Sequence, residues 1–174
     1  LSEVPTLCPL LAKWHHREWG DLTPEWTAEE VLQDLRSHTG THTIPTTLVA
    51  LEEGEPLGSA SLLPENFAEL DAWSPWLASV YVARPYRRRG VGRALVARIC
   101  EIAVGMGVEH IYLFTVDRAS FYLELGWTIE ETTTIRDTPV VIMSRVLSVA
   151  PDPDPHHDGT GGVRADREPS DPTR

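Results

Sequence analysis

The chain has 174 residues, of which 41% are hydrophobic and 24% charged, and its formal net charge is −11. These values are typical of one globular domain, and the acidity argues against non-specific nucleic-acid binding. No run of apolar residues is long enough to cross a membrane, and the N-terminal sequence lacks the features of a secretory signal, so we expect a cytoplasmic protein. Cys8 and Cys100 fit neither a metal site nor a disulfide framework, and we expect no metal.

The first half of the chain predicts two helices followed by a β-hairpin. Residues 8–19 carry apolar side chains at helical spacing. Thr27 and Glu30 form a capping-box pattern at the start of a second helix that ends near Ser37. Residues 46–53 and 57–63 are predicted strands joined at Gly54, and a loop rich in acidic and aromatic residues follows them.

The second half predicts a strand over 77–83, a glycine-containing turn, a helix over 93–105 and a strand over 108–116. A short helix then ends at Gly126, and residues 128–137 and 138–147 form two paired strands. This order indicates an α/β or α+β sheet with one strand–turn–helix crossover. Residues 1–149 are the predicted domain, and residues 150–174, rich in Pro, Asp and Gly, are a predicted disordered tail.

Positive charge is concentrated at the turn between the strand over 77–83 and the helix. Residues 84–98 contain six arginines and neither Asp nor Glu. At the start of a helix the free backbone amides and the helix dipole favour an anion, and Gly90 and Gly92 would let a phosphate approach the backbone closely. Charge-assisted donors would surround that phosphate: Arg87, Arg88, Arg89 and Arg93. The turn is therefore a predicted phosphate site.

Other binding patterns fit less well. The chain has no GxxxxGK[ST] sequence, and residues 105–110 lack the third glycine of a dinucleotide-binding turn. His38 and His42 are four residues apart, but they lie in a Thr- and Gly-rich stretch that is more typical of a surface loop than of a metal site.

Two segments resemble one enzyme family. VYVARPYRRRGVGRALV resembles the acetyl-CoA signature of the GCN5-related N-acetyltransferases (GNAT), with its core [QR]-x-x-G-x-[GA] at residues 87–92. FYLELGW, residues 121–127, resembles the family's F-Y-x-x-x-G-[FWY] segment. The resemblance covers residues 8–147, is strongest over 76–127, and implies a mixed, mostly antiparallel sheet of about six to seven strands. That sheet would be splayed at its central strands and flanked by about four helices.

The resemblance also implies a reaction and a set of residues. A family member transfers an acetyl group from acetyl-CoA directly to a primary amine. The pyrophosphate would bind the backbone at Arg87, Arg88, Arg89, Gly90, Val91, Gly92, Arg93 and Ala94. The pantetheine arm would pair with Val80, Tyr81 and Val82, and Tyr122 would protonate the leaving thiolate. The alternative is a non-catalytic member that binds acyl-CoA as a sensor or an assembly subunit.

The general base and the acceptor stay open. Residues 77–83 contain no acid, although many members have a Glu there, and Thr115 stands where many have an Asn. The candidates for a base or a substrate contact are Glu69, Asp71 and Asp117. Trp73 and Trp76 would complete an acidic, aromatic rim, and the helix with Trp14, His15 and Trp19 an opposite wall. The amine belongs to a peptide, a polyamine, an amino sugar or a small metabolite. No nucleic-acid or membrane partner is expected, and a homodimer is left open.

Overall fold

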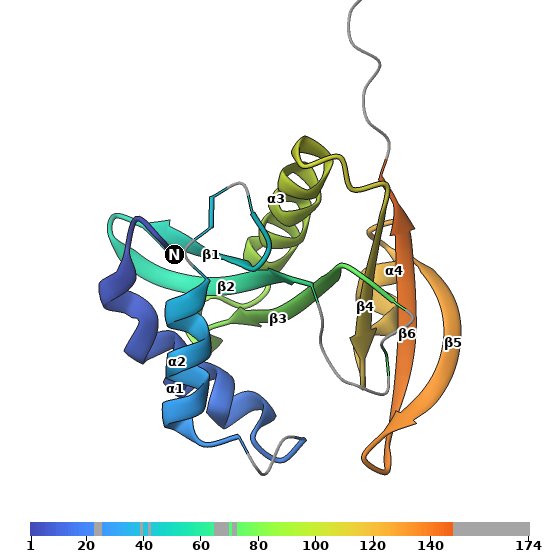
Figure 1. Cartoon of the computed structure of the whole chain (residues 1–174), viewed down its shortest axis with the longest axis horizontal. Helices are drawn as coiled ribbons and strands as arrows, with labels where there is room; N and C mark the ends of the chain where they lie inside the picture. Colours follow the sequence, from blue (N-terminus) through green and yellow to red (C-terminus); the bar gives the residue numbers. More distant parts are fainter. Residues whose placement is uncertain (23–25, 39, 42, 65–69, 71–72, 148–174) are drawn as a thin grey trace, which may run out of the picture.

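The computed structural model describes residues 1–22, 26–38, 40–41, 43–64, 70 and 73–147. Its helices and strands are η1 (Pro5–Leu7), α1 (Cys8–Trp19), α2 (Ala28–Ser37), β1 (Thr46–Glu52), β2 (Glu55–Leu63), β3 (Trp76–Val82), η3 (Arg84–Tyr86), α3 (Val91–Gly105), β4 (His110–Thr115), α4 (Ala119–Leu123), β5 (Thr128–Ile135) and β6 (Thr138–Val146). These elements follow the predicted order, with ends that differ by a few residues (Figure 1). The predicted tail, residues 150–174, lies outside the described residues.

The strands form one six-stranded sheet in the order β1-β2-β3-β4-β6-β5. Every neighbouring pair is antiparallel except β3 and β4, which are parallel. The two predicted strand pairs, β1 with β2 and β5 with β6, are confirmed. The mixed, mostly antiparallel sheet with four α-helices therefore matches the expected fold class.

Helices cover both faces of the β1–β3 half (Figure 1). On one face, Leu95, Val96 and Ile99 of α3 pack with Ala60 and Leu62 of β2 in the main core. On the other face, α1 and α2 bury Leu11, Ala12, Val31 and Leu35 in a smaller cluster. The predicted capping box starts α2: the Thr27 hydroxyl accepts from the Glu30 amide, and the Glu30 carboxylate accepts from the Thr27 amide (2.8 Å). This cap fixes where α2 begins and how it lies on the sheet.

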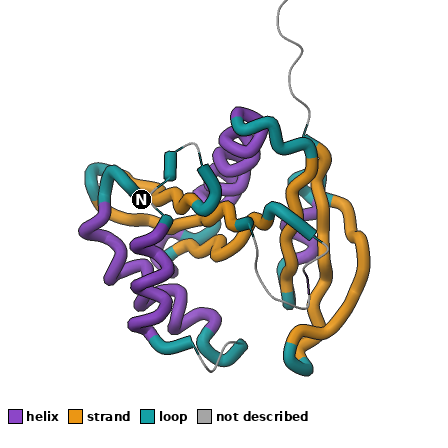
Figure 2. Tube along the Cα trace, in the orientation of Figure 1, coloured by secondary structure: helices purple, strands orange, loops and turns teal. Residues whose placement is uncertain are grey.

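The sheet is splayed between β3 and β4. Their ladder consists of one pair, Trp76 with Tyr112, next to a hydrogen bond from the Tyr112 amide to the Pro75 carbonyl (3.0 Å). Beyond that pair the β1–β3 and β4–β6 halves run in different directions (Figure 2). The edge of β3 from Ala78 to Val82 therefore has no strand partner on the β4 side among the described residues.

Trp76 corrects one expectation. Instead of standing on an exposed rim, it is 1% exposed and packs with Leu70, Val140 and Ile142 in a core cluster of the β4–β6 half. Its indole N–H donates to the Trp73 carbonyl (2.6 Å), and its ring lies 6.2 Å from that of Tyr112. Trp76 thus holds the two halves together at the point where they separate.

Within the described residues, no helix is both long and apolar enough to span a membrane. Cys8 and Cys100 are free and buried, and no cluster of metal-ligating side chains occurs among the residues searched.

Candidate functional site

The predicted phosphate site lies where the splayed strand leads into α3. Arg88 and Gly90 have positive φ angles, 61° and 85°, so the chain turns sharply between η3 and α3. Gly90 is the N-cap of α3 and makes no side-chain capping bond. The first intrahelical bond runs from the Ala94 amide to the Gly90 carbonyl (3.0 Å), so the helix itself offers no acceptor to the amides that precede Ala94. Such a helix start accommodates an anion.

Gly92 stands at the junction of three elements. A Cβ built on Gly92 would lie 3.6 Å from Cγ2 of Val82 in β3 and 3.7 Å from Cζ of Phe121 in α4. These are ordinary van der Waals distances, so the fold itself tolerates a methyl group at this position. Three elements thus meet around Gly92: the end of β3, the start of α3 and the short helix α4.

Three of the four predicted arginines are paired with carboxylates from distant elements. Arg87 lies 3.6 Å from Glu18 of α1, Arg89 3.1 Å from Glu52 of β1, and Arg93 3.6 Å from Glu124. For Arg88 no such ion pair is found in the described part of the chain. The side chains of these pairs are 40–69% exposed, so each pair is weak and a phosphate can displace it.

Arg87 differs from the other arginines because its side chain also turns back to the sheet. Its Nε donates to the Val82 carbonyl (2.8 Å), and its guanidinium lies 5.7 Å from the centre of the Tyr81 ring. Arg87 therefore holds the end of β3 in place, while its backbone remains part of the turn.

A bulge interrupts β3 beside the splay. In the pairing with β2, Ser59 faces Tyr81 and Ser61 faces Ala78, so Ser79 and Val80 together stand opposite a single residue, Ala60. Ser79 has a φ angle of 51°, which a non-glycine residue rarely adopts. Bulges reorient the strand that contains them, and this one lies directly before the predicted pantetheine contacts Val80, Tyr81 and Val82.

Tyr122 is buried in the main core, with its ring 5.0 Å from that of Phe121 and 5.9 Å from that of Trp127. Burial raises the pKa of Tyr122 to about 12. Its hydroxyl makes no hydrogen bond to another residue within the described ranges. The phenol is therefore neutral at physiological pH and can donate its proton or a hydrogen bond to a ligand.

Thr115 has a local structural role. Its hydroxyl accepts a hydrogen bond from the Arg118 amide (3.0 Å), which fixes the turn between β4 and α4. Asp117, beside it, is exposed and lies 3.2 Å from the Arg118 guanidinium. Asp117 is thus at the C-terminal end of β4, open to solvent. Glu69 and Asp71, the other acidic candidates, lie outside the described residues.

The predicted wall formed by α1 packs on β3. Trp14 and Trp19 lie 5.1 Å and 6.4 Å from the Tyr81 ring, and both are half-buried. His15, between them, is buried and its Nε2 lies 2.9 Å from the Ser59 hydroxyl. Burial, with a smaller contribution from His38, lowers the pKa of His15 to about 4, so this imidazole is neutral at pH 7.

Sequence analysis missed a buried polar cluster on β1 and β2. The hydroxyls of Thr47 and Ser61 lie 2.8 Å apart, and His38, at the end of α2, contacts Thr47 through Nδ1 (2.8 Å). The alternation of serines with Ala60 and Leu62 in β2 was the available signal. It would have suggested a solvent-facing side, whereas α1 and α2 cover that side.

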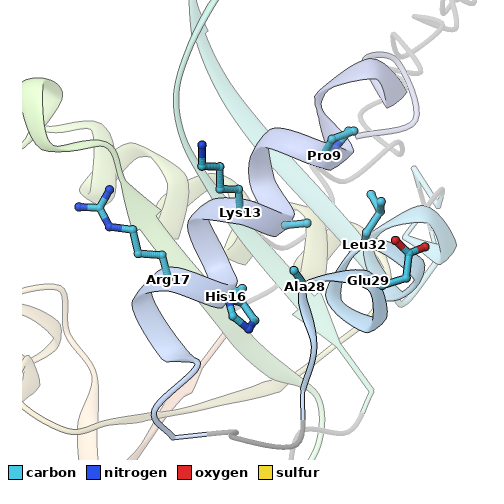
Figure 3. A pocket seen from close by; sticks show the side chains of 8 residues that line it. Pro9, Lys13, His16, Arg17, Ala28, Glu29 and Leu32 are labelled. Atoms are coloured by element: carbon cyan, nitrogen blue, oxygen red, sulfur yellow. The ribbon is translucent and has the colours of Figure 1, made fainter.

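A groove of about 350 Å³ lies between α1 and α2 (Figure 3). Lys13, His16 and Arg17 of α1 line it on one side, and Ala28, Glu29 and Leu32 of α2 on the other. None of the predicted site residues lines this groove.

Comparisons with known proteins agree with this fold. A model described as "Acetyltransferase (GNAT) family" matches residues 10–127. No curated protein matches the chain significantly. Among solved structures, an aminoglycoside 6'-N-acetyltransferase complexed with coenzyme A is similar at 17% identity and a TM-score of 0.64, covering 85% of this chain and 94% of that chain.

Two further structures are similar. A GNAT acetyltransferase from Streptococcus pneumoniae has 19% identity and a TM-score of 0.61, over 83% of this chain and 95% of that chain. The yncA protein of Salmonella typhimurium, solved with its cofactor acetyl-CoA, has 18% identity and a TM-score of 0.64, over 87% of this chain and 94% of that chain. At these identities the likeness shows the shared fold, and the family match covers more than half of the sequence. The chain therefore belongs to the GNAT family of acetyltransferases.

Proposed function

We propose that this protein transfers the acetyl group of acetyl-CoA directly to a primary amine. The observation that carries the proposal is the convergence at Gly92, where an uncapped helix start, a splayed strand edge and the helix bearing Tyr122 meet. An anion at the helix start and an extended arm along the strand edge is the geometry that coenzyme A needs. Coenzyme A or acetyl-CoA is present in two of the similar structures.

Different groups of the chain would bind the different parts of coenzyme A. The amides of residues 87–94 would hold the pyrophosphate, and Arg88, which has no carboxylate partner in the described part, is the arginine most available to it. The unpaired edge of β3 at Val80, Tyr81 and Val82 would receive the amide groups of the pantetheine arm. An N–H of the same edge, directed at the thioester carbonyl, would stabilise the negative charge that develops on its oxygen.

In the transfer, the amine nitrogen forms a bond to the thioester carbonyl carbon and the carbon–sulfur bond breaks. Tyr122 donates its O–H to the departing sulfur. Because the pKa of Tyr122 is about 12 and that of an ordinary thiol is ~8.5, complete proton transfer to a free thiolate is unfavourable. We therefore expect Tyr122 to stabilise the leaving sulfur mainly through a hydrogen bond, while solvent supplies the proton after release.

The acceptor is an amine whose substrate class is open. Aminoglycosides are the acceptors named for one of the similar structures, and they carry primary amines. Asp117, at the exposed end of β4, is our candidate for contact with a cationic amine, together with Glu69 and Asp71. The competing possibility, acyl-CoA binding without transfer, is favoured by the lack of any acid between Leu77 and Ala83.

Two measurements test the proposal. At ten times its Kd, acetyl-CoA should stabilise the protein by RT ln 11, ~1.4 kcal/mol, which corresponds to a rise in Tm of about 3–6 °C. A panel of spermidine, kanamycin, glucosamine and a peptide with a free N-terminus is then assayed for release of free thiol. Thiol release with at least one amine is the expected result. Stabilisation without any thiol release would favour the sensor, and no stabilisation would refute both possibilities.

A further inference from the structure

A continuous chain of polar side-chain contacts runs from α2 to β1 and on to the neighbouring strand β2. Asp34 Oδ2 of α2 lies 3.4 Å from His38 Nε2, His38 Nδ1 lies 2.8 Å from the Thr47 hydroxyl of β1, and that hydroxyl lies 2.8 Å from the Ser61 hydroxyl of β2. His38, Thr47 and Ser61 are at most 3% exposed. The Asp34 side chain is 43% exposed, so the chain connects solvent to the interior of the sheet.

The inner end of this chain lies beside the predicted acetyl-transfer site. Ser61 pairs directly with Ala78 of β3, on the face covered by α1 and α2 and next to the bulge at Ser79 and Val80. Ala78 is partly exposed, so the buried Ser61 is directly paired with a residue that reaches solvent at the splay. This position is also the part of β3 in which the sequence supplies no carboxylate.

We propose that Asp34, His38, Thr47 and Ser61 form the path by which the acceptor ammonium loses its proton. The inference rests on the proposed acetyl transfer. A water molecule beside Ala78 takes a proton from the ammonium and passes one to the Ser61 oxygen. The Ser61 proton moves to Thr47, the Thr47 proton moves to Nδ1 of His38, and the imidazolium that forms lies against the Asp34 carboxylate.

For protons to move along this path, each residue must carry its proton on a defined atom before the reaction. Nδ1 of His38 must accept, so its neutral ring carries the proton on Nε2, facing Asp34. Thr47 then donates to His38 and Ser61 donates to Thr47, so every donor in the chain points the same way. None of the four residues touches the reacting atoms, and all four are positioning residues of the path.

Other titratable groups surround the path. From α1, His15 faces the same region, and its pKa is affected by the charges of His38 and Asp34. The amino group of Leu1 donates to the Thr47 carbonyl (2.6 Å), and burial lowers its pKa. On this face, β1 and β2 contribute hydroxyls at Thr47, Ser59 and Ser61.

The pair formed by His15 and Ser59 is a matched control. Like the path, it contains a buried histidine in contact with a buried hydroxyl, and that hydroxyl belongs to a serine of β2 two residues from Ser61. Within the described residues, however, no carboxylate contacts His15 as Asp34 contacts His38. A variant of Ser59 therefore removes an equivalent buried hydroxyl without interrupting the path.

The experiment compares Thr47→Val, which removes the hydroxyl at nearly constant volume, with Thr47→Ser, which keeps it. Turnover is measured from pH 6 to 9.5 with saturating acetyl-CoA and the best acceptor among spermidine, kanamycin, glucosamine and an N-terminal peptide. Thr47→Val should lower kcat at pH 7 by ~10²-fold, with the Kd for acetyl-CoA unchanged. The deficit should shrink by about tenfold per pH unit, since the neutral fraction of an amine rises by that factor below its pKa.

Thr47→Ser should restore both the rate and the pH profile, and Ser59→Ala should keep the profile of the unmodified protein. If Thr47→Val fails to fold, Ser61→Ala interrupts the same path and should reproduce the same pH-dependent deficit. Nitrogen NMR of His38 provides a readout that needs no acceptor, and the proton is expected on Nε2.

Three results would overturn the proton path alone: a pH-independent deficit, an equal deficit in Thr47→Ser, or a His38 proton on Nδ1. Absence of thiol release by the unmodified protein with every amine would refute the acetyl transfer itself, and the path with it.

Discussion

Replacement of Gly92 by Ala should separate cofactor affinity from stability. The added Cβ would lie 3.6 Å from Val82 and 3.7 Å from Phe121, ordinary contact distances that require no shift of the fold. Ala is favoured over Gly inside a helix by ~0.5–1 kcal/mol. Because Gly92 is in the first turn of α3, the expected change in unfolding free energy lies between zero and about 1 kcal/mol of stabilisation, a rise in Tm of at most ~2–4 °C.

The same methyl group should weaken the binding of coenzyme A. It would stand between the helix start and the edge of β3, where the pyrophosphate leads into the pantetheine arm in our proposal. An amide of the first turn would then lose a charge-assisted hydrogen bond, worth ~1.5–3 kcal/mol, and the Kd should rise about ten- to a hundredfold.

Gly105→Ala is the matched control, because Gly105 is the last residue of the same helix and a Cβ there has no atom within 4 Å. Calorimetric titration with coenzyme A and thermal unfolding without ligand are measured on both variants. Both variants should keep or gain stability, and only Gly92→Ala should lose affinity. Unchanged affinity in Gly92→Ala, or an equal loss in Gly105→Ala, would refute the placement of the cofactor at this turn.

Three further predictions concern single side chains. Tyr122→Phe should lower kcat by ~10–10²-fold, the loss of one hydrogen bond to a charged group, with little change in Tm or in the Kd for acetyl-CoA, since its hydroxyl has no hydrogen-bond partner in the described part; steady-state kinetics with unchanged kcat would exclude Tyr122 from the mechanism. The pKa of His15 is lowered from 6.5 to about 4, so the stabilisation from its neutral form is complete above pH 6.5 and is lost as the pH falls through 4, ~3 kcal/mol in all; His15→Asn should flatten the pH dependence of urea unfolding, and an unaltered dependence would contradict the assignment. Arg88→Ala should weaken coenzyme A binding several-fold at constant Tm, whereas Arg87→Ala should lower Tm because it loses the bond to the Val82 carbonyl; titrations and melts that show the reverse would exchange the two roles.

Local sequence patterns predicted the parts of the fold that depend on neighbouring residues. The capping box at Thr27 and the hairpin at Gly54 need only a few consecutive residues, and both are present. The turn at Gly90 was predictable for the same reason. A glycine readily adopts the left-handed φ angle found there, and the helical pattern of α3 begins directly after it. The predicted positions of these features therefore agree with the structure.

The ion-pair partners of the arginines and the burial of Trp76 and Ser61 depend on tertiary packing, which the sequence alone does not show. Glu18, Glu52 and Glu124 are distant in sequence, yet each pairs with an arginine of the turn. Trp76 lies beside an acidic loop, which suggested an exposed rim, but the first residue of β3 faces the core of the β4–β6 half. Ser61 lies in an alternating pattern that is typical of a half-exposed strand, yet it is buried and contacts the Thr47 hydroxyl of β1.

In our proposals, the path that receives the amine proton and the tyrosine that faces the leaving sulfur lie on opposite halves of the sheet. Ser61 and the path to Asp34 belong to the β1–β3 half, whereas Tyr122 belongs to α4 in the β4–β6 half. The halves are joined at the splay by the Trp76–Tyr112 pair. The distance between the group that receives the amine proton and the group that faces the leaving sulfur is therefore set by that junction. A change that loosens the packing of Trp76 on Tyr112 should impair transfer while leaving the helix start of α3, and hence pyrophosphate binding, intact.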